Sequence, residues 1–158
     1  MKFFNTSADR KSVDALRRLD VFRELTFKEA LEVSELLHER IYEKGEIIFE
    51  QGDIGHGIYV VISGKVRVDS AQESWKGAVV EFGPGEMLGE LSLFEEAPRM
   101  VTAVAAERAV VVALFRTEFF SLLTANTKIG MKILVKIAGT MCRRTRLLLL
   151  DERHHPSV

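Results

Sequence analysis

One short segment, residues 83–103, combines residue types that suit an anion bound beside a hydroxyl group. Gly89 lets the backbone approach a ligand closely, and residues 90–93 can form one helical turn whose free N–H groups face an anion. Ten positions after Gly89 stands Arg99, whose guanidinium can donate two parallel hydrogen bonds to a phosphate. The Glu90 carboxylate would repel a phosphate, so it should face a hydrogen-bond donor such as a sugar hydroxyl. The pattern therefore favours a ribose phosphate.

Short β-strands are predicted on both sides of this segment, because from Ile41 onward the sequence consists of runs rich in Val, Ile, Phe and Tyr that glycines separate. The predicted strands are Ile41–Glu43, Ile47–Glu50, Ile58–Ser63, Lys65–Asp69, Ala78–Phe82, Met100–Ala106 and Ala109–Phe115. These are too many for one flat sheet in a chain of this length, and a jelly-roll β-barrel closes the sheet edges. Pro98 would hold Arg99 at the start of a strand.

Helical spacing of apolar residues flanks the β-rich region on both sides. The spacing predicts helices over Ser12–Leu19, Thr26–His38, Thr117–Leu123 and Lys128–Asp151. Thr26 and Glu29 have the spacing of a capping box, and Thr117 is a candidate cap. The fold class is therefore mainly β with flanking α. We expect N-terminal helices in residues 1–40, the barrel in 41–116, and C-terminal helices with a tail in 117–158.

Length and composition limit the classes of protein that this sequence can form. A chain of 158 residues with 47% apolar and 28% charged residues fits one soluble domain with a hydrophobic core. The net charge of −1 gives no general attraction to nucleic acid or to an anionic membrane surface. The single cysteine, Cys142, excludes an intramolecular disulfide and fits a reducing compartment. No apolar run has the length of a signal peptide or a membrane span, so we expect a cytoplasmic protein without membrane contact.

Catalytic and metal chemistry find little support among the other polar residues. Ser92, His56 and Glu95 lack a motif that would fix a base beside the serine hydroxyl. His154 and His155 are neighbours in a tail that contains a proline, and no third metal ligand is evident. We therefore expect no catalytic residue, no metal site and no enzyme activity.

The predicted helix Lys128–Asp151 carries three arginines, Arg143, Arg144 and Arg146, for which two interpretations are open. They could form a nucleic-acid patch, or a solvated face that complements the helix dipole near its C-terminus. On a near-neutral chain we favour the solvated face. The apolar residues of the same helix cover more than one face, so we expect this helix to contact a ligand or a partner.

A family resemblance covers most of the chain, from about residue 21 to residue 150. The phosphate-binding cassette of the cyclic nucleotide-binding domain family resembles the run Gly89-Glu90-Leu91-Ser92-Leu93, followed after four residues by Pro98-Arg99. The first half of the family's barrel resembles residues 44–53 and 59–68. The cassette and the upstream segments together make the chain similar to this family over far more than one motif.

The resemblance implies a role for each cassette residue. Glu90 would hold the ribose 2′-hydroxyl, and Arg99 would pair with the cyclic phosphate. Backbone N–H groups near Gly89, Leu91 and Ser92 would complete the phosphate site. The ligand would be a cyclic nucleotide, and no other cofactor is implied.

The sequence departs from the family pattern directly after the arginine, where Met100 and Val101 replace small residues. A serine or threonine at this place could bond to phosphate or guanine, so its absence favours cyclic AMP over cyclic GMP. Both residues would also line the ligand site and narrow it. Leu147 to Leu150 of the C-terminal helix would form an apolar lid over the base with little discrimination between bases.

These features predict a cytoplasmic sensor domain that signals by moving its C-terminal helix when a cyclic nucleotide binds. The excess apolar surface of that helix would join two copies in a homodimer, or bind an effector protein. Related transcription regulators continue into a helix-turn-helix domain, which does not follow in these 158 residues, so we expect no DNA binding by this chain. The alternative is a protein-interaction module whose pocket Met100 and Val101 have closed.

Overall fold

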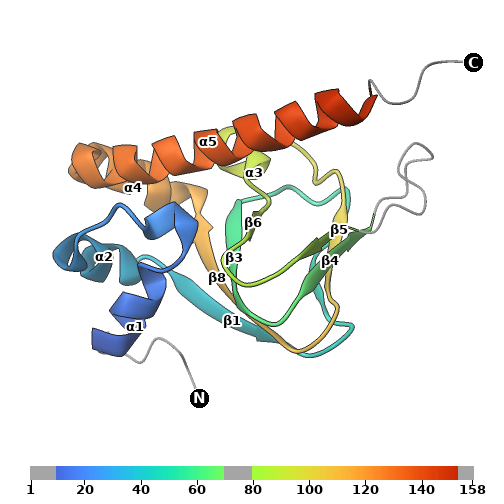
Figure 1. The fold of residues 1–158 in the computed structure, drawn as a ribbon, viewed down its shortest axis with the longest axis horizontal. Helices are drawn as coiled ribbons and strands as arrows, with labels where there is room; N and C mark the ends of the chain where they lie inside the picture. Colours follow the sequence, from blue (N-terminus) through green and yellow to red (C-terminus); the bar gives the residue numbers. More distant parts are fainter. Residues whose placement is uncertain (1–9, 70–79, 153–158) are drawn as a thin grey trace, which may run out of the picture.

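Two antiparallel sheets of four strands form the centre of the computed structural model, which describes residues 10–69 and 80–152 (Figure 1). The first sheet has the order β1 (His38–Tyr42), β8 (Ala109–Phe115), β3 (Gly57–Ser63) and β6 (Met87–Leu88). The second has the order β2 (Ile47–Phe49), β7 (Thr102–Ala105), β4 (Val66–Asp69) and β5 (Val80–Phe82). Strands from early and late parts of the sequence alternate in both sheets, which gives a jelly roll.

The inner faces of the two sheets pack against each other in one apolar cluster. Its buried residues are Ile48, Val61, Val66, Val68, Leu88, Ala103, Ala105, Ala109 and Val111. They come from both sheets. Along β4 and β7, buried residues alternate with half-buried ones, as expected for strands that turn one face toward a core.

β8 differs from the other strands, because every residue from Ala109 to Leu114 is buried. Ala109 and Val111 belong to the cluster between the sheets, whereas Val112 and Leu114 belong to a second cluster beneath the helices. β8 pairs with β1 on one side and with β3 on the other. Its uninterrupted apolar sequence therefore reflects a strand that is covered on both faces.

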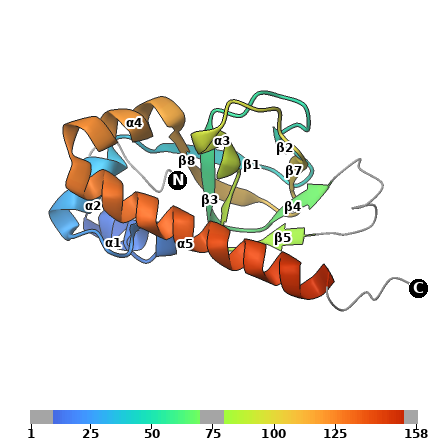
Figure 2. The same ribbon diagram turned by 90° about the horizontal axis from the view of Figure 1, so that it is seen from above.

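The helices are α1 (Arg10–Leu16), the 3-10 helix η1 (Asp20–Phe22), α2 (Phe27–Ser34), the short α3 (Leu91–Phe94), α4 (Arg116–Ala125) and the long α5 (Thr127–Glu152). α1, α2 and α4 lie together at one end of the barrel, while α3 lies over the barrel and α5 runs along it (Figures 1 and 2). The first half of α5 lies along η1 and α4, and its second half continues past the barrel on the side of β5. The second cluster joins these helices to β3 and β8, so residues of all three predicted segments share one core.

The first half of α5 is anchored to the N-terminal helices by ion pairs. Glu29 accepts hydrogen bonds from the Lys132 ammonium at 2.6 Å and from the Thr26 N–H at 2.8 Å. Both interactions lower the pKa of the Glu29 carboxyl to about 2. One helical turn further along α5, Lys136 pairs with Glu24 at 3.0 Å. Three isoleucines of this half of α5, Ile129, Ile133 and Ile137, are also buried. Apolar and polar contacts therefore hold the first half of α5 together.

The structure confirms the fold class that the sequence predicts, including the barrel, the flanking helices and the long C-terminal helix. The capping box at Thr26 is also confirmed, because both of its hydrogen bonds are present. Sequence patterns missed β6, which has two residues and is too short to show an alternation. Residues 78 and 79 of a predicted strand lie outside the described residues, and β5 is described from Val80.

Several predicted boundaries are wrong. The second helix ends at Ser34, and His38 already belongs to β1, because the apolar residues between them pack onto the core from a connection rather than from a helix. The strand predicted to begin at Met100 begins at Thr102, so the preceding residues form a loop rather than part of a sheet. Thr117 is not a cap and lies inside α4.

Within residues 10–69 and 80–152, no helix combines the length and the apolar character that a membrane crossing requires.

We expect Phe119→Ala to lower the free energy of unfolding by about 3–5 kcal/mol, because this ring is fully buried and its loss leaves a cavity. Phe120→Ala is the matched control, since its ring is 42% exposed and the substitution should cost about 1 kcal/mol or less. Urea unfolding followed by circular dichroism measures both changes. Equal losses would contradict the placement of Phe119 in the core.

Candidate functional site

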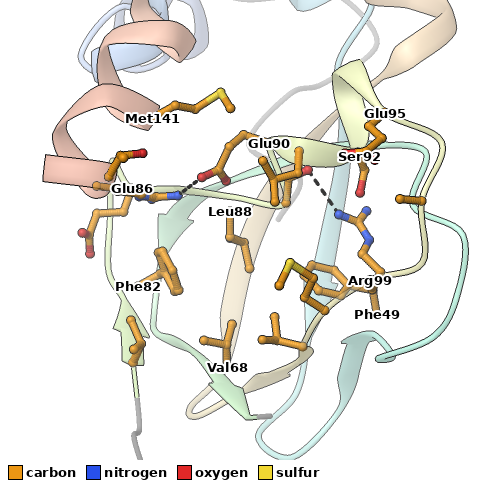
Figure 3. Close-up of a pocket in the computed structure, with 18 of the residues that line it drawn as sticks. Phe49, Val68, Phe82, Glu86, Leu88, Glu90, Ser92, Glu95, Arg99 and Met141 are labelled. Atoms are coloured by element: carbon orange, nitrogen blue, oxygen red, sulfur yellow. Dashed lines mark hydrogen bonds and ion pairs between the residues drawn. The ribbon is translucent and has the colours of Figure 1, made fainter. Parts of the chain in front are cut away.

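A cavity of about 1150 Å³ lies between the barrel and the second half of α5 (Figure 3). Its barrel wall comes from β2, β4, β5, β6, α3 and the loop before β7. Its lining includes all seven residues that the sequence singled out, namely Gly89, Glu90, Leu91, Ser92, Arg99, Met100 and Val101. The fold thus brings both ends of the predicted cassette to one cavity, while the ligand contacts of these residues stay predictions.

Arg99 is the only buried charged residue among those that the structure describes, with 7% of its surface exposed. Its guanidinium donates one hydrogen bond to the Gly89 carbonyl at 3.2 Å and another to the Gly57 carbonyl at 3.1 Å. Its central carbon lies 4.1 Å from the centre of the Phe49 ring, which gives a cation–π contact. Burial lowers the pKa of Arg99, while the nearby Tyr59 and Glu90 act in the opposite direction. The side chain still carries its charge at neutral pH.

Two glycines make room for this guanidinium. Gly89 has a φ of +79°, an angle that residues with a side chain rarely adopt. A Cβ at this position would also overlap the end of the Arg99 side chain. At Gly55 a Cβ would lie 2.7 Å from Nε of Arg99 and would also overlap Ser92. The backbone therefore closes around the arginine at positions where no larger residue fits.

Glu90 faces a different wall of the cavity from Arg99 (Figure 3). It occupies the position before the first residue of α3, and 12% of its side chain is exposed. Its Oε1 accepts a hydrogen bond from Nη1 of Arg144 at 2.5 Å. A ligand that touches both predicted residues would therefore have to reach from the Phe49 side of the cavity to the side of α5.

Arg144 lines the cavity, although its sequence context favoured a solvated face. Its guanidinium also donates to the Met87 carbonyl and lies 5.1 Å from the centre of the Phe82 ring. The solvated-face interpretation is therefore wrong for Arg144, although Arg143 and Arg146 are exposed as expected. Burial alternates around a helix, so three arginines within four residues cannot share one environment. The three-residue spacing between the apolar Met141 and Arg144 would have placed both on the barrel side of α5.

The short turn that contains Ser92 also differs from the prediction. The N–H of Ser92 is not free for an anion, because it donates to the Gly89 carbonyl at 3.2 Å and closes the turn. The serine side chain still lines the cavity. Of the predicted anion donors, the Ser92 N–H is therefore used within the turn, while the Arg99 guanidinium lines the cavity.

The remaining wall of the cavity is largely apolar. Barrel residues Phe49, Val68, Val80, Phe82 and Leu88 face residues Met141, Leu147 and Leu150 of α5 across it. Met100 and Val101 also contribute, but Met100 is 55% exposed and the cavity beside it is open. A flat apolar group of a ligand would fit between these two walls.

The charges in the lining set the chemistry that this cavity can perform. Two guanidiniums, those of Arg99 and Arg144, are the cations, and the lining carboxylates belong to Glu81, Glu86, Glu90 and Glu95. Glu86 is occupied with its own turn, where it accepts the Gly83 N–H at 2.7 Å. Within the described segments, no three His, Cys, Asp or Glu residues gather as a metal site would need. The arrangement suits the binding of a compact anion that also carries a hydroxyl and an apolar ring.

Comparison with known proteins gives matches over most of the chain. Residues 39–126 match the family described as the cyclic nucleotide-binding domain. The cyclic AMP receptor protein of Thermus thermophilus is 41% identical over 85 residues, which are 53% of this chain and 39% of that protein. The structure of the Thermus thermophilus catabolite activator protein has a TM-score of 0.73 at 32% identity, over 85% of this chain and 62% of that chain. A cyclic nucleotide-binding domain from Methylobacillus flagellatus shares the fold, with a TM-score of 0.81 at 18% identity over 94% of this chain and 88% of that chain. The chain spans less than two thirds of the length of the curated relatives.

We expect Gly89→Ala to destabilise the protein more than Gly85→Ala does. Both glycines have a positive φ, so each substitution adds a backbone strain of about 1 kcal/mol. Only at Gly89 would the new Cβ also displace the Arg99 guanidinium, because nothing lies within 4 Å of a Cβ at Gly85. Thermal unfolding of the two variants measures the difference, and equal melting temperatures would argue against a tight fit around Arg99.

Proposed function

Because this chain belongs to the cyclic nucleotide-binding domain family, we propose that it binds a cyclic nucleotide in the cavity between the barrel and α5. Cyclic AMP is the favoured ligand over cyclic GMP, and the position of α5 reports whether the cavity is occupied. The observation that carries this proposal is that Arg99 and Glu90 line one cavity from two ends of a short connection. These residues supply a cation for a phosphodiester and an acceptor for a ribose hydroxyl.

The phosphate would lie beside Arg99. The guanidinium is held by two carbonyls and the Phe49 ring, so it is already oriented before a ligand arrives. A preorganised donor loses little conformational entropy on binding, which favours affinity. An anion would also compensate the desolvated charge of Arg99, a residue that is only 7% exposed.

The base would lie in the apolar part of the cavity, between Phe82 on the barrel and Leu147 on α5. An apolar enclosure gives few hydrogen bonds by which one base could be told from another. The preference for cyclic AMP rests on the position after Arg99, where Met100 offers no hydroxyl to guanine. A relative that is named a cyclic AMP receptor protein supports the same preference.

The competing candidate is an interaction module that keeps the barrel but binds no nucleotide. It requires Met100 and Val101 to close the pocket. The size of the cavity, about 1150 Å³, and the 55% exposure of Met100 support the binding function instead. Calorimetric titration with cyclic AMP and cyclic GMP separates the two candidates, because the module predicts no heat and no thermal shift at millimolar ligand.

We propose binding without turnover, so cyclic AMP should be recovered unchanged after long incubation with the protein. The lining supplies no recognised nucleophile beside a base, and chromatography of the recovered ligand tests this point. Appearance of the hydrolysed nucleotide would replace the sensor function with an enzymatic one.

Arg99→Ala should weaken the binding of cyclic AMP by about 2–5 kcal/mol, because it leaves a desolvated phosphate without its cation. Arg67→Ala is the matched control: that arginine lies on β4 in an exposed pair with Asp69 at 3.1 Å, and its loss should leave affinity unchanged. Isothermal titration calorimetry measures both, and a circular dichroism spectrum verifies that each variant is folded. Unchanged affinity of a folded Arg99→Ala protein would refute the phosphate assignment.

We also propose that α5 joins two copies of the chain in a parallel homodimer, in preference to an effector protein. An exposed stripe runs along the helix with the 4-3-4-3-4 spacing of a coiled-coil seam. The stripe consists of Met131, Val135, Ala138, Cys142, Thr145 and Leu149. In a parallel pair of identical helices, each seam residue would lie opposite the same residue of the second copy. The uncharged side chains of this stripe can tolerate such contacts.

Val135→Glu should convert the dimer into a monomer and raise the dissociation constant by roughly a hundredfold or more, because it buries an unpaired charge in the seam. Ile41→Glu makes the same chemical change on exposed β1, away from α5 (Figure 1), and should leave the dimer intact. Sedimentation velocity gives the mass relative to the 17.8 kDa chain. A short bismaleimide should link the two Cys142 thiols in the wild type only while it is dimeric. A monomeric wild type at high concentration would disprove this interface.

A further inference from the structure

α5 contains two glycines, and the space around them differs. At Gly130 a Cβ would lie 2.7 Å from Cδ2 and 2.9 Å from Cα of Leu123, so a glycine at this position lets α4 and α5 pack closely. At Gly139 the nearest atom outside the helix backbone would be Nη1 of Arg143, at 3.7 Å, which is an ordinary van der Waals distance. Packing therefore explains Gly130 and does not explain Gly139.

Gly139 and the residue that follows it weaken the same turn of α5. Inside a helix, glycine disfavours the helical form roughly fivefold relative to alanine. Oγ1 of Thr140 donates a hydrogen bond to the Lys136 carbonyl at 3.1 Å. This carbonyl is also the acceptor of the helical N–H at position 140, and hydroxyl bonds of this kind often bend helices. α5 nevertheless runs without a break from Thr127 to Glu152.

The packing of α5 changes at this point. Ile137 is the last buried residue of α5 among those whose burial is described. The ion pairs of Lys132 and Lys136 with the N-terminal helical region also lie before Gly139. After it, the helix continues past the barrel along the cavity (Figure 2), where its described residues are half-buried or exposed. The tightly packed part of α5 thus ends just before the weakened turn.

One ion pair after this turn still reaches the N-terminal helices, but it is weak. Arg143 and Asp20 lie 3.4 Å apart, and the exposed fractions of their side chains are 62% and 41%. Exposed pairs of this kind contribute little to stability in water. This pair therefore does little to prevent a change in the direction of the second half of α5.

We propose that Gly139 and Thr140 form a hinge within α5, about which the second half of the helix turns as a unit while the first half stays in place. Bending at this point moves the cavity wall that α5 supplies and leaves the apolar core covered. The hinge itself does not depend on a ligand. Its use to report a bound nucleotide rests on the proposed function.

The alternative is that α5 turns as one rigid rod about its connection with α4. Two features of the structure oppose it. The close contact of Gly130 with Leu123 fixes the angle between the two helices, and Ile129 and Ile133 would have to leave the core.

Distances between spin labels test the hinge without a ligand. In a Cys142→Ser background, one label is placed at Lys65→Cys on the barrel, and the other at Arg146→Cys in the second half of α5 or at Lys128→Cys in the first half; all three lysine and arginine positions are exposed. Dilution into unlabelled protein restricts double electron–electron resonance to distances within one chain. The distance distribution of the Arg146 pair should be roughly twice as wide as that of the Lys128 pair, because a hinge moves only the end of the helix. Gly139→Ala should remove this difference, since alanine favours the helical form about fivefold. Equal widths in the otherwise unsubstituted chain, or a wide distribution that persists in Gly139→Ala, would overturn the proposal.

Two threonines provide a matched control for the second hinge residue. Thr124 in α4 makes the same bond as Thr140, from Oγ1 to the Phe120 carbonyl at 3.0 Å. Valine has nearly the shape of threonine and lacks the hydroxyl, so Thr140→Val should narrow the distribution of the Arg146 pair, whereas Thr124→Val should leave it unchanged. Circular dichroism verifies that each variant is folded. An unchanged distribution in Thr140→Val would contradict the role of Thr140, and equal narrowing in both variants would contradict its location.

Cyclic AMP separates the hinge from the proposed function. Where calorimetry shows binding, the nucleotide should narrow the distribution of the Arg146 pair in the wild-type helix and change it little in Gly139→Ala. A nucleotide-dependent change of full size in Gly139→Ala would show that α5 moves as a rigid rod, and the hinge would be refuted. A protein that binds no cyclic nucleotide would refute the proposed function, while the distances measured without a ligand would still decide on the hinge.

Discussion

A buried guanidinium must be compensated, and the barrel around Arg99 is arranged to meet this need. Two backbone carbonyls and an aromatic ring surround the side chain, and two glycines allow the backbone to come that close. None of these groups carries a full negative charge, so the arginine is oriented but not neutralised. The cavity on its open side is therefore a place where an anion gains more free energy than it would at an exposed arginine. The mainly apolar wall next to it then restricts which anions fit.

The two halves of α5 are held by different kinds of contact, and this difference bears on the proposed movement of the helix. Ile129, Ile133 and Ile137 bury the first half in the core, where displacement would expose apolar surface. The second half carries exposed residues such as Leu149 and is tied to the barrel through Arg144. A ligand can shift only an equilibrium between states of similar free energy, so under the proposed function the second half is the part whose position a ligand would change.

The sequence predicted the barrel because its strands are short, rich in β-branched residues and divided by glycines, and it predicted the site because Gly89, Glu90 and Arg99 have distinct chemistry at a fixed spacing. It did not predict the partners of those residues. The two carbonyls that accept from Arg99 are backbone groups, whose direction a residue type does not reveal, and Arg144 has the same residue type as two exposed neighbours. β6 was too short for any pattern. The spacing of apolar residues in a sequence predicts which face of a helix or strand a residue occupies. The partners of that residue depend on how segments distant in the sequence pack together.

Under the proposed function, Arg144 is a polar contact through which a largely apolar cavity would respond to a polar ligand. Apolar residues such as Leu147 gain free energy from covering any ring, so they favour closure over many different ligands. An ion pair is directional, and its strength depends on what else the carboxylate of Glu90 contacts and on the net charge around it. A phosphodiester bound beside Arg99 would add a negative charge to a cavity that already contains this pair, and so would increase the attraction of the site for the Arg144 guanidinium. The position of α5 would then depend on the charge and the hydroxyl of the ligand. The leucines would contribute only a free energy of apolar burial that differs little between ligands.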